Sequence, residues 1–198
     1  MKKIILTAVA FLVFGFIYAQ KAQFGAKVAL NVATLTGDVE NPSSYIGWQI
    51  GGFAEFKISE KFAIQPELMY SAQGGKESYN EEGFNADTTI KLGYINIPIM
   101  AKYYVAKSFS LEAGPQIGFL ISAKGELEAG GESVEVDIKD DVESVDFGLN
   151  LGAGYDFTEK FSAGLRYNFG LSDISKDIDG ESYDVKNGVF SLSVGYKF

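Results

Sequence analysis

Seven charged residues stand apart from one another in stretches of the chain that otherwise alternate apolar with small or polar residues. Two carboxyl groups close together can act as general acid and general base, and a serine beside a lysine can act as a nucleophile. Glu55, Glu67 and Glu112 are the candidates for such paired-carboxylate chemistry. The whole set consists of Lys27, Glu55, Glu67, Lys102, Glu112, Asp146 and Arg166.

Other features of the composition favour a structural role for these charges. The chain has no histidine and no cysteine, so histidine-based proton transfer and thiolate metal sites are excluded. The three glutamates have Lys27, Lys102 and Arg166 as counter-charges, and buried charges need such partners. We therefore predict an internal ion-pair network, with no catalytic residue and no cofactor. A histidine-free lipid-modifying or hydrolytic enzyme is the alternative.

The elements that must position these charges are strands. Apolar residues recur at every second position, as in Phe24, Ala26, Val28, Leu30 and Val32, and a period of two predicts β-structure. Eight such runs occur, at residues 24–33, 46–58, 62–71, 95–105, 109–119, 146–155, 161–170 and 190–198. Their connections differ in length. Three are tight, at 59–61, 106–108 and 158–160, and four are long, at 35–44, 73–91, 123–144 and 172–187.

The side chains on the two faces of these runs predict what each face contacts. The polar face carries many glycines and alanines and few charges, which suits a narrow interior, while the apolar face has aromatic residues next to each tight turn, as at a membrane interface. We therefore predict an all-β fold, an eight-stranded antiparallel up-and-down transmembrane β-barrel with short periplasmic turns and longer extracellular loops. Eight strands leave an interior that side chains fill, so we expect a plugged lumen. A soluble lipocalin-like barrel is the alternative.

The N-terminus has the layout of a secretory signal. Lys2 and Lys3 precede an apolar core over residues 4–17, and Ala19 follows. That core is shorter than the ~20 residues that a spanning helix needs. We expect residues 1–19 to be a cleaved signal peptide and residues 20–198 to form the barrel domain. A retained membrane anchor is the alternative.

The C-terminus resembles the signal by which bacterial outer-membrane proteins are recognised by their assembly machinery. It consists of Phe190, Leu192, Val194, Tyr196 and the terminal Phe198. Segments such as "GYINIPIMAKYY" and "FGLNLGAGYDF" further resemble the Bacteroidetes outer-membrane β-barrel family, which includes PorT-like and "porin family" proteins. The resemblance implies a bacterial outer-membrane location and, through its PorT-like members, an accessory role in protein secretion.

The four long connections are strongly acidic. They hold 19 of the 26 acidic residues of the chain, and the net charge of −9 argues against nucleic acid as a partner. Val134, Val136 and Ile138 alternate with polar residues, which suggests a hairpin extending past the membrane. Asp177, Asp179 and Asp184 form a weak match to a calcium-binding loop. The match is weak because the acids do not have the spacing found in an EF-hand. We expect a non-enzymatic protein whose acidic loops serve surface interaction, adhesion or envelope integrity. Its expected partners are outer-membrane lipid and lipopolysaccharide, with divalent cations bridging to the loops as one form of that contact.

Three prolines fall inside predicted strands, at Pro66, Pro98 and Pro115. Proline cannot donate a hydrogen bond to the ladder, so we expect local bulges at these positions.

Overall fold

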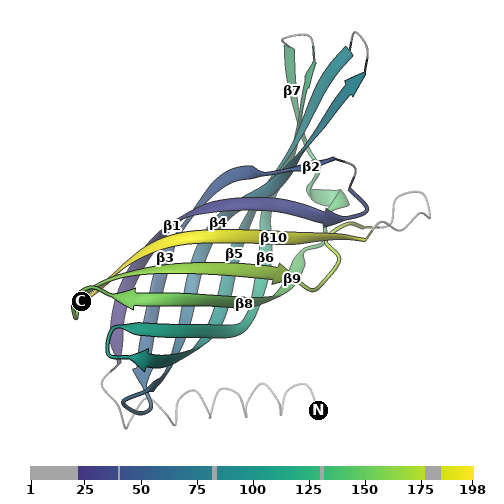
Figure 1. The fold of residues 1–198 in the computed structure, drawn as a ribbon. Helices are drawn as coiled ribbons and strands as arrows, with labels where there is room; N and C mark the ends of the chain where they lie inside the picture. The colour runs from purple at the N-terminus through teal and green to yellow at the C-terminus, as the bar shows by residue number, and fades with distance from the viewer. Residues whose placement is uncertain (1–21, 40, 82–83, 130–131, 177–183) are drawn as a thin grey trace, which may run out of the picture.

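Eight long strands form a closed barrel in the computed structural model, which describes residues 22–39, 41–81, 84–129, 132–176 and 184–198 (Figure 1). They are β1 (Gln23–Gly37), β3 (Tyr45–Lys57), β4 (Phe62–Glu81), β5 (Phe84–Ala106), β6 (Phe109–Ala129), β8 (Val145–Asp156), β9 (Phe161–Gly170) and β10 (Val185–Lys197). All neighbours are antiparallel, which confirms the predicted eight-stranded up-and-down topology. The predicted signal peptide, residues 1–19, lies outside the described residues.

The first and last barrel strands close the structure. β1 pairs with β10 from Gly25↔Lys197 to Gly37↔Val185, and on its other side it pairs with β3. A closed ladder satisfies backbone donors and acceptors without water, which a wall in contact with lipid requires.

The three predicted tight turns lie together at one end of the barrel, the tight-turn end. Each joins neighbouring strands, β3 to β4, β5 to β6 and β8 to β9. Two are stabilised by side chains, because Ser59 Oγ accepts a hydrogen bond from the Phe62 amide at 3.1 Å and Thr158 Oγ1 accepts one from the Phe161 amide at 2.9 Å. The similar sequences of these turns, Ser-Glu-Lys and Thr-Glu-Lys, therefore form similar structures.

Strands continue past the barrel at the opposite, long-loop end. β4 and β5 pair as far as Glu81↔Phe84, so residues 73–81 and 84–91, predicted as parts of one loop, are the two strands of a β-hairpin. The prediction was wrong because the acidic, glycine-containing sequence does not show a strand pattern. These residues are instead held in strands by a ladder that continues in register from the barrel. The predicted hairpin within 123–144 is confirmed, since β6 pairs with β7 (Glu132–Asp137). We call residues 75–81, 84–91, 123–129 and 132–137 the projecting sheet (Figure 1). A two-residue strand, β2 (Pro42–Ser43), pairs with β4 at its base.

Bulges do not occur at the three prolines. Pro66 and Met69 have the partners Ile99 and Asn96, and Pro115 lies within an unbroken register with β8. The register shifts of the β5–β6 pair lie between Gly93 and Tyr94 and between Tyr104 and Ala106. The expectation was wrong because the ladder leaves out the pairs next to a proline and resumes in the same register.

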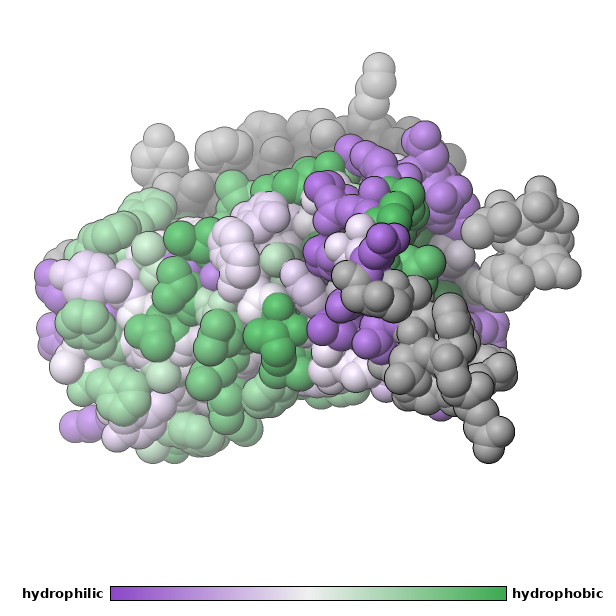
Figure 2. Space-filling model, turned by 90° about the horizontal axis from the view of Figure 1, so that it is seen from above, coloured by the Kyte–Doolittle hydropathy of each residue, from purple (hydrophilic) through white to green (hydrophobic). Residues whose placement is uncertain are grey.

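The two faces of the barrel wall differ sharply in polarity. Side chains such as Leu30, Trp48 and Leu192 are exposed on the outside, whereas Asn31, Glu55 and Asn150 are buried inside. Hydrophobic surface covers the barrel wall in Figure 2, and hydrophilic residues gather toward the long-loop end. In the described part of the chain, no helix has the length and apolar character needed to cross a membrane.

An apolar cluster fills the mouth at the long-loop end. Leu35, Leu92, Tyr94, Leu120, Ala123, Val142 and Ile174 are buried together there. Residues 138–144 and 171–176, which we call the mouth cap, cross over this cluster. They are joined by a bridge between Val142 and Ser175 and by the hydrogen bond from the Glu143 amide to the Ile174 carbonyl at 2.8 Å.

Candidate functional site: the charge network of the barrel interior

Each of the eight barrel strands contributes one charged side chain to a network in the interior near the tight-turn end. In strand order from β1 these are Lys27, Glu55, Glu67, Lys102, Glu112, Asp156, Arg166 and Lys197. They point inward because of the two-residue alternation along each strand. Four are cations and four are anions, so the network is electrically neutral.

Glu67 is the most heavily bonded member. Its Oε1 accepts hydrogen bonds from Lys27 Nζ at 2.6 Å, Gln65 Nε2 at 2.8 Å and Arg166 Nη2 at 2.9 Å. Its Oε2 accepts a further bond from Arg166 Nη1 at 3.0 Å. The Arg166 pair is therefore bidentate, which is the strong arrangement for a guanidinium and a carboxylate.

The network continues through Glu112 and Lys102 to the last strand. Arg166 Nη2 also contacts Glu112 Oε2 at 3.1 Å, and Lys102 Nζ lies 3.4 Å from Glu112 Oε1. Lys102 donates to Glu55 Oε2 at 3.1 Å, and the same carboxylate contacts Lys197 Nζ at 3.1 Å. Most of these pairs join strands that are separated by one other strand, and the pair between Glu67 on β4 and Arg166 on β9 ties opposite walls together.

The sequence reasoning missed two charged members of the network. Lys197 lies 3.5 Å from Asp156 Oδ1, and both residues lie at strand ends among aromatic side chains. Tyr104 was missed as well, and its hydroxyl donates to Glu55 Oε2 at 3.2 Å. Lys197 could have been recognised from the sequence, because it lies between Tyr196 and Phe198 at a position of the alternating strand that points inward.

Asp146 was grouped with these charges, but the structure places it apart from them. Its carboxylate accepts hydrogen bonds from Ser172 Oγ at 2.8 Å and Asn187 Nδ2 at 2.9 Å. The physical reason is its position along the barrel axis. Gly152 on β8 is the Cα partner of Glu112, a member of the network. Asp146 lies six residues before Gly152, which places it about 20 Å away along the strand. It therefore anchors the mouth cap through Ser172.

A layer of neutral amides and hydroxyls separates the charges from the mouth. Asn31 Nδ2 donates to Ser71 Oγ at 3.1 Å, and Ser191 Oγ donates to Asn31 Oδ1 at 2.9 Å. On the other side, Asn168 and Gln116 bond to Asn150. The interior is thus stacked as charges, then amides, then the apolar cluster.

This arrangement does not present a free catalytic pair. Every carboxylate of the network contacts at least one cation, so none is available to take up or deliver a proton at a substrate without losing that contact. Among the described residues, no group of three or more acids could hold a metal ion. Of the weak calcium candidates, Asp177 and Asp179 lie outside the described residues, and the Asp184 carboxylate pairs with Lys186.

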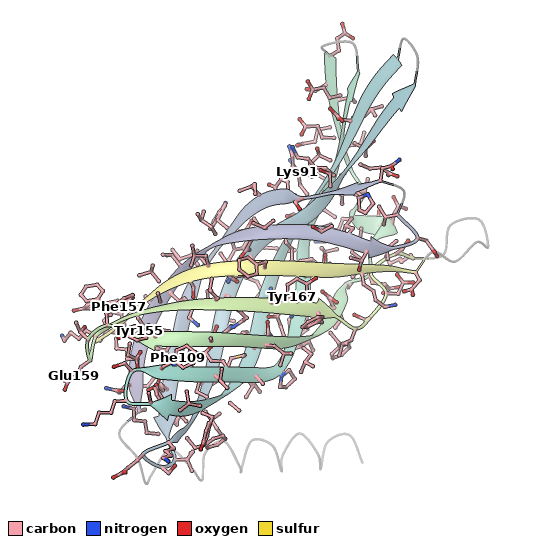
Figure 3. The ribbon with its side chains drawn as sticks, in the orientation of Figure 1. Lys91, Phe109, Tyr155, Phe157, Glu159 and Tyr167 are labelled. Carbon is pink, nitrogen blue, oxygen red and sulfur yellow. The ribbon has the colours of Figure 1, made fainter. Side chains whose placement is uncertain are left out.

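The residues predicted as an assembly signal face outward on β10. Phe190, Leu192, Val194, Tyr196 and Phe198 are all exposed. Tyr196 contacts the rings of Phe161 and Phe198, with centroids 5.0 and 5.8 Å away. Phe109, Tyr155 and Phe157 lie at the same tight-turn end, beside Glu159, while Tyr167 lies farther along the wall (Figure 3). An outward aromatic band at one level fits a membrane interface.

Comparison with known proteins gives the family. Residues 18–176 match the family described as "Outer membrane protein beta-barrel domain". The chain belongs to this outer-membrane β-barrel family. The exposed apolar wall is therefore the surface that contacts lipid, and the protein is located in the outer membrane.

Two solved structures share the fold of this outer-membrane barrel. Ail, the attachment invasion locus protein of Yersinia pestis, in complex with the heparin analogue sucrose octasulfate, is 14% identical with a TM-score of 0.50, and the match covers 89% of this chain and 99% of Ail. Neisserial surface protein A is 12% identical with a TM-score of 0.52, and the match covers 90% of this chain and 100% of the other. A search of curated proteins finds no match.

Proposed function

We propose that this protein is a sealed, non-enzymatic anchor in the outer membrane, which presents its acidic long-loop end for surface interaction or envelope integrity. The observation that carries the proposal is the neutral network of eight charges inside the barrel. An eight-stranded barrel is narrow enough for side chains to fill it. Here they form ion pairs across the interior, and the apolar cluster covers the other end.

The sealed interior argues against both a pore and an enzyme. An ion passing through would have to displace paired charges and then cross the apolar cluster, and each step is costly. A hydrolytic or lipid-modifying reaction would need a carboxylate or lysine free of its partner.

The long-loop end is the part left to make contacts outside the membrane. We place it on the extracellular side, because short turns face the periplasm in barrels of this kind. The solved structure of Ail contains a polysulfated heparin analogue. The acidic connections of this chain favour ligands of the opposite charge, either a basic partner or divalent cations that bridge to lipopolysaccharide phosphates.

Conductance tests the sealed interior. The purified wild-type barrel, reconstituted in a planar bilayer, is expected to show no stable current steps. A double variant, Glu67→Ala with Arg166→Ala, removes the central bidentate pair and is the positive control for detecting a leak. Stable ion-sized steps from the wild-type monomer would refute the proposal.

The surface role is tested in cells. Replacing residues 124–137 with a short glycine-serine turn keeps the barrel ladder and removes half of the projecting sheet. We expect this strain to match the deletion strain in adhesion and in sensitivity to detergent, while retaining wild-type amounts of folded barrel. Wild-type behaviour of the turn variant, beside a defective deletion strain, would assign the role to the barrel itself.

A further inference from the structure

The projecting sheet has one charged and one apolar face. On the charged face, Lys91 contacts Glu126 at 2.6 Å and Glu135 at 3.4 Å, and Lys124 contacts Glu135 at 2.6 Å. Figure 3 places Lys91 on this sheet, beyond the barrel wall. These ion pairs neutralise much of the charge on that face within the sheet itself.

The opposite face exposes aliphatic side chains to solvent. Leu127, Val134 and Val136 are 50%, 61% and 54% exposed. Leu127 and Val134 are Cα partners, and Val136 is the partner of Gly125, so the three share one face. A hydrophobic patch among hydrophilic atoms is visible in this region in Figure 2. Exposed apolar patches with polar rims mark interaction surfaces.

This apolar face leads into a groove at the base of the projecting sheet. The groove has a volume of about 180 Å³ and is lined by Leu35, Asp38, Val39, Gly75, Lys76, Glu77, Thr88, Ile90 and Val185. Ile90 is the Cα partner of both Gly75 and Gly125, so the groove and the exposed valines lie on one continuous face. A cavity of roughly 150 Å³ can hold benzene, so the groove has room for one aromatic ring or aliphatic side chain.

Glycine shapes this groove. A Cβ at Gly75 would lie 2.8 Å from Leu35 Cγ, so only glycine lets Leu35 pack against β4 at this point. Leu35, Ile90 and Val185 also contact the apolar cluster of the mouth. The floor of the groove is therefore held by the barrel rather than by the projecting sheet alone.

The rim of this surface is mainly acidic. Asp38 and Glu77 line the groove together with one cation, Lys76, and Glu132 lies on the same phase of β7 as Val134. Among the described residues, no cation lies within ion-pairing distance of these three acids, in contrast to Glu126 and Glu135. Asp38 Oδ2 accepts a hydrogen bond from the Asp184 amide at 3.0 Å, and the negative charges of all three acids can still attract a basic ligand.

The charge decides between possible occupants. A second copy would bring the same acids against Asp38, Glu77 and Glu132, and a lipopolysaccharide surface would bring anionic phosphates. A polypeptide with alternating apolar and basic residues matches both the apolar strip and its rim. We infer that this face and its groove bind an extended basic segment of a partner protein, with an apolar side chain in the groove and lysine or arginine against the three acids. The inference rests on the proposed surface role and identifies its partner chemistry.

Peptide binding tests the inference on the full-length barrel in phosphatidylcholine nanodiscs. The probe is a fluorescent nine-residue peptide of alternating lysine and leucine, measured by anisotropy with empty nanodiscs subtracted. Two comparison peptides replace leucine by serine or lysine by glutamate. We expect the lysine–leucine peptide to bind about tenfold more tightly than either, a difference of about 1.4 kcal/mol.

Matched variants locate the site. Val134→Asn places an amide on the apolar face and is expected to weaken binding about tenfold, whereas Ser133→Asn places the same amide on the opposite face and leaves binding unchanged. Glu77→Gln with Glu132→Gln is expected to weaken binding severalfold and to reduce its salt dependence. Asp87→Asn with Glu128→Gln removes the same charge from the other face and is expected to have little effect. Heat-modifiable gel migration verifies that each variant is folded.

Three results would overturn the inference. One is equal binding of the lysine–serine peptide, which would mean that general attraction to an acidic surface suffices. Another is an equal effect of the two asparagine variants or of the two charge pairs. The third is wild-type dimerisation in nanodiscs that Val134→Asn abolishes, which would make a second copy the occupant. A conducting barrel that still binds the peptide would refute the sealed interior and leave this inference standing.

Discussion

Replacing Glu67 by glutamine should strongly destabilise the barrel. The Glu67 side chain is 0% exposed and accepts four hydrogen bonds, three of them from Lys27 and Arg166. Glutamine keeps one acceptor oxygen and places an NH2 group against existing donors, and the network changes from neutral to a net charge of +1. Removing one partner of a buried ion pair costs about 3–5 kcal/mol. We expect the free energy of unfolding to fall by that amount.

Urea unfolding in lipid vesicles measures this loss. Trp48, the single tryptophan of the chain, lies on the outer face of β3, so its fluorescence reports contact with lipid. The control is Glu60→Gln, which makes the same chemical change in an exposed tight turn and should alter stability by no more than about 0.5 kcal/mol. Adding Lys27→Met to Glu67→Gln restores neutrality and should recover about 1–2 kcal/mol through the coupling of the two sites.

Two results would refute this reasoning. If Glu67→Gln cost less than about 1 kcal/mol, water would be reaching the network and compensating the lost charge. If the double variant were no more stable than the single one, charge balance would not be the quantity that matters.

Three further predictions concern the ends of the barrel. Hydrogen bonding from Lys124 holds the pKa of Glu135 below its usual 4.5, and hydrogen bonding with Glu126 raises the pKa of Lys91 above 10.5. The stabilisation of the projecting sheet should therefore be complete between these two usual values. It should be lost as the pH falls through the lowered pKa of Glu135 or rises through the raised pKa of Lys91. Amide hydrogen exchange along β7 measures this, and protection that does not change with pH would contradict the prediction. Phe198→Ala should lower the amount of assembled barrel in the outer-membrane fraction severalfold, whereas Phe24→Ala, equally outward on the neighbouring strand, should not. In the absence of lipopolysaccharide, adding calcium should leave the unfolding temperature unchanged, because Asp184 already pairs with Lys186, and a clear rise would restore the calcium-loop interpretation.

The two-residue alternation predicts the strands and their faces well. It placed Lys27, Glu67 and Arg166 inside and Leu30 and Leu192 outside, because each phase of a strand points to one face whatever its neighbours are. The three tight turns, at 59–61, 106–108 and 158–160, followed from the short gaps between neighbouring alternating runs.

The position of each charge along the barrel axis, and therefore its ion-pair partner, could not be predicted in the same way. Whether Asp146 meets Arg166 depends on strand tilt and stagger, which only the closed ladder fixes. The hairpin within residues 73–91 was missed for a related reason, since the β4–β5 ladder, rather than strong local strand propensity, holds those residues extended. The role in secretion that the PorT-like resemblance implies stays a prediction, and protein export in a deletion strain would test it.

The ion pairs of the interior also bear on how the barrel assembles in the membrane. Lys197 on β10 bonds to Glu55 on β3, and these two strands come within reach of each other only when β10 pairs with β1 between them. A half-rolled sheet entering the bilayer would carry bare charges toward acyl chains, at a severe cost. Incomplete intermediates are therefore kept out of the membrane by their own electrostatics, and insertion becomes an all-or-none event.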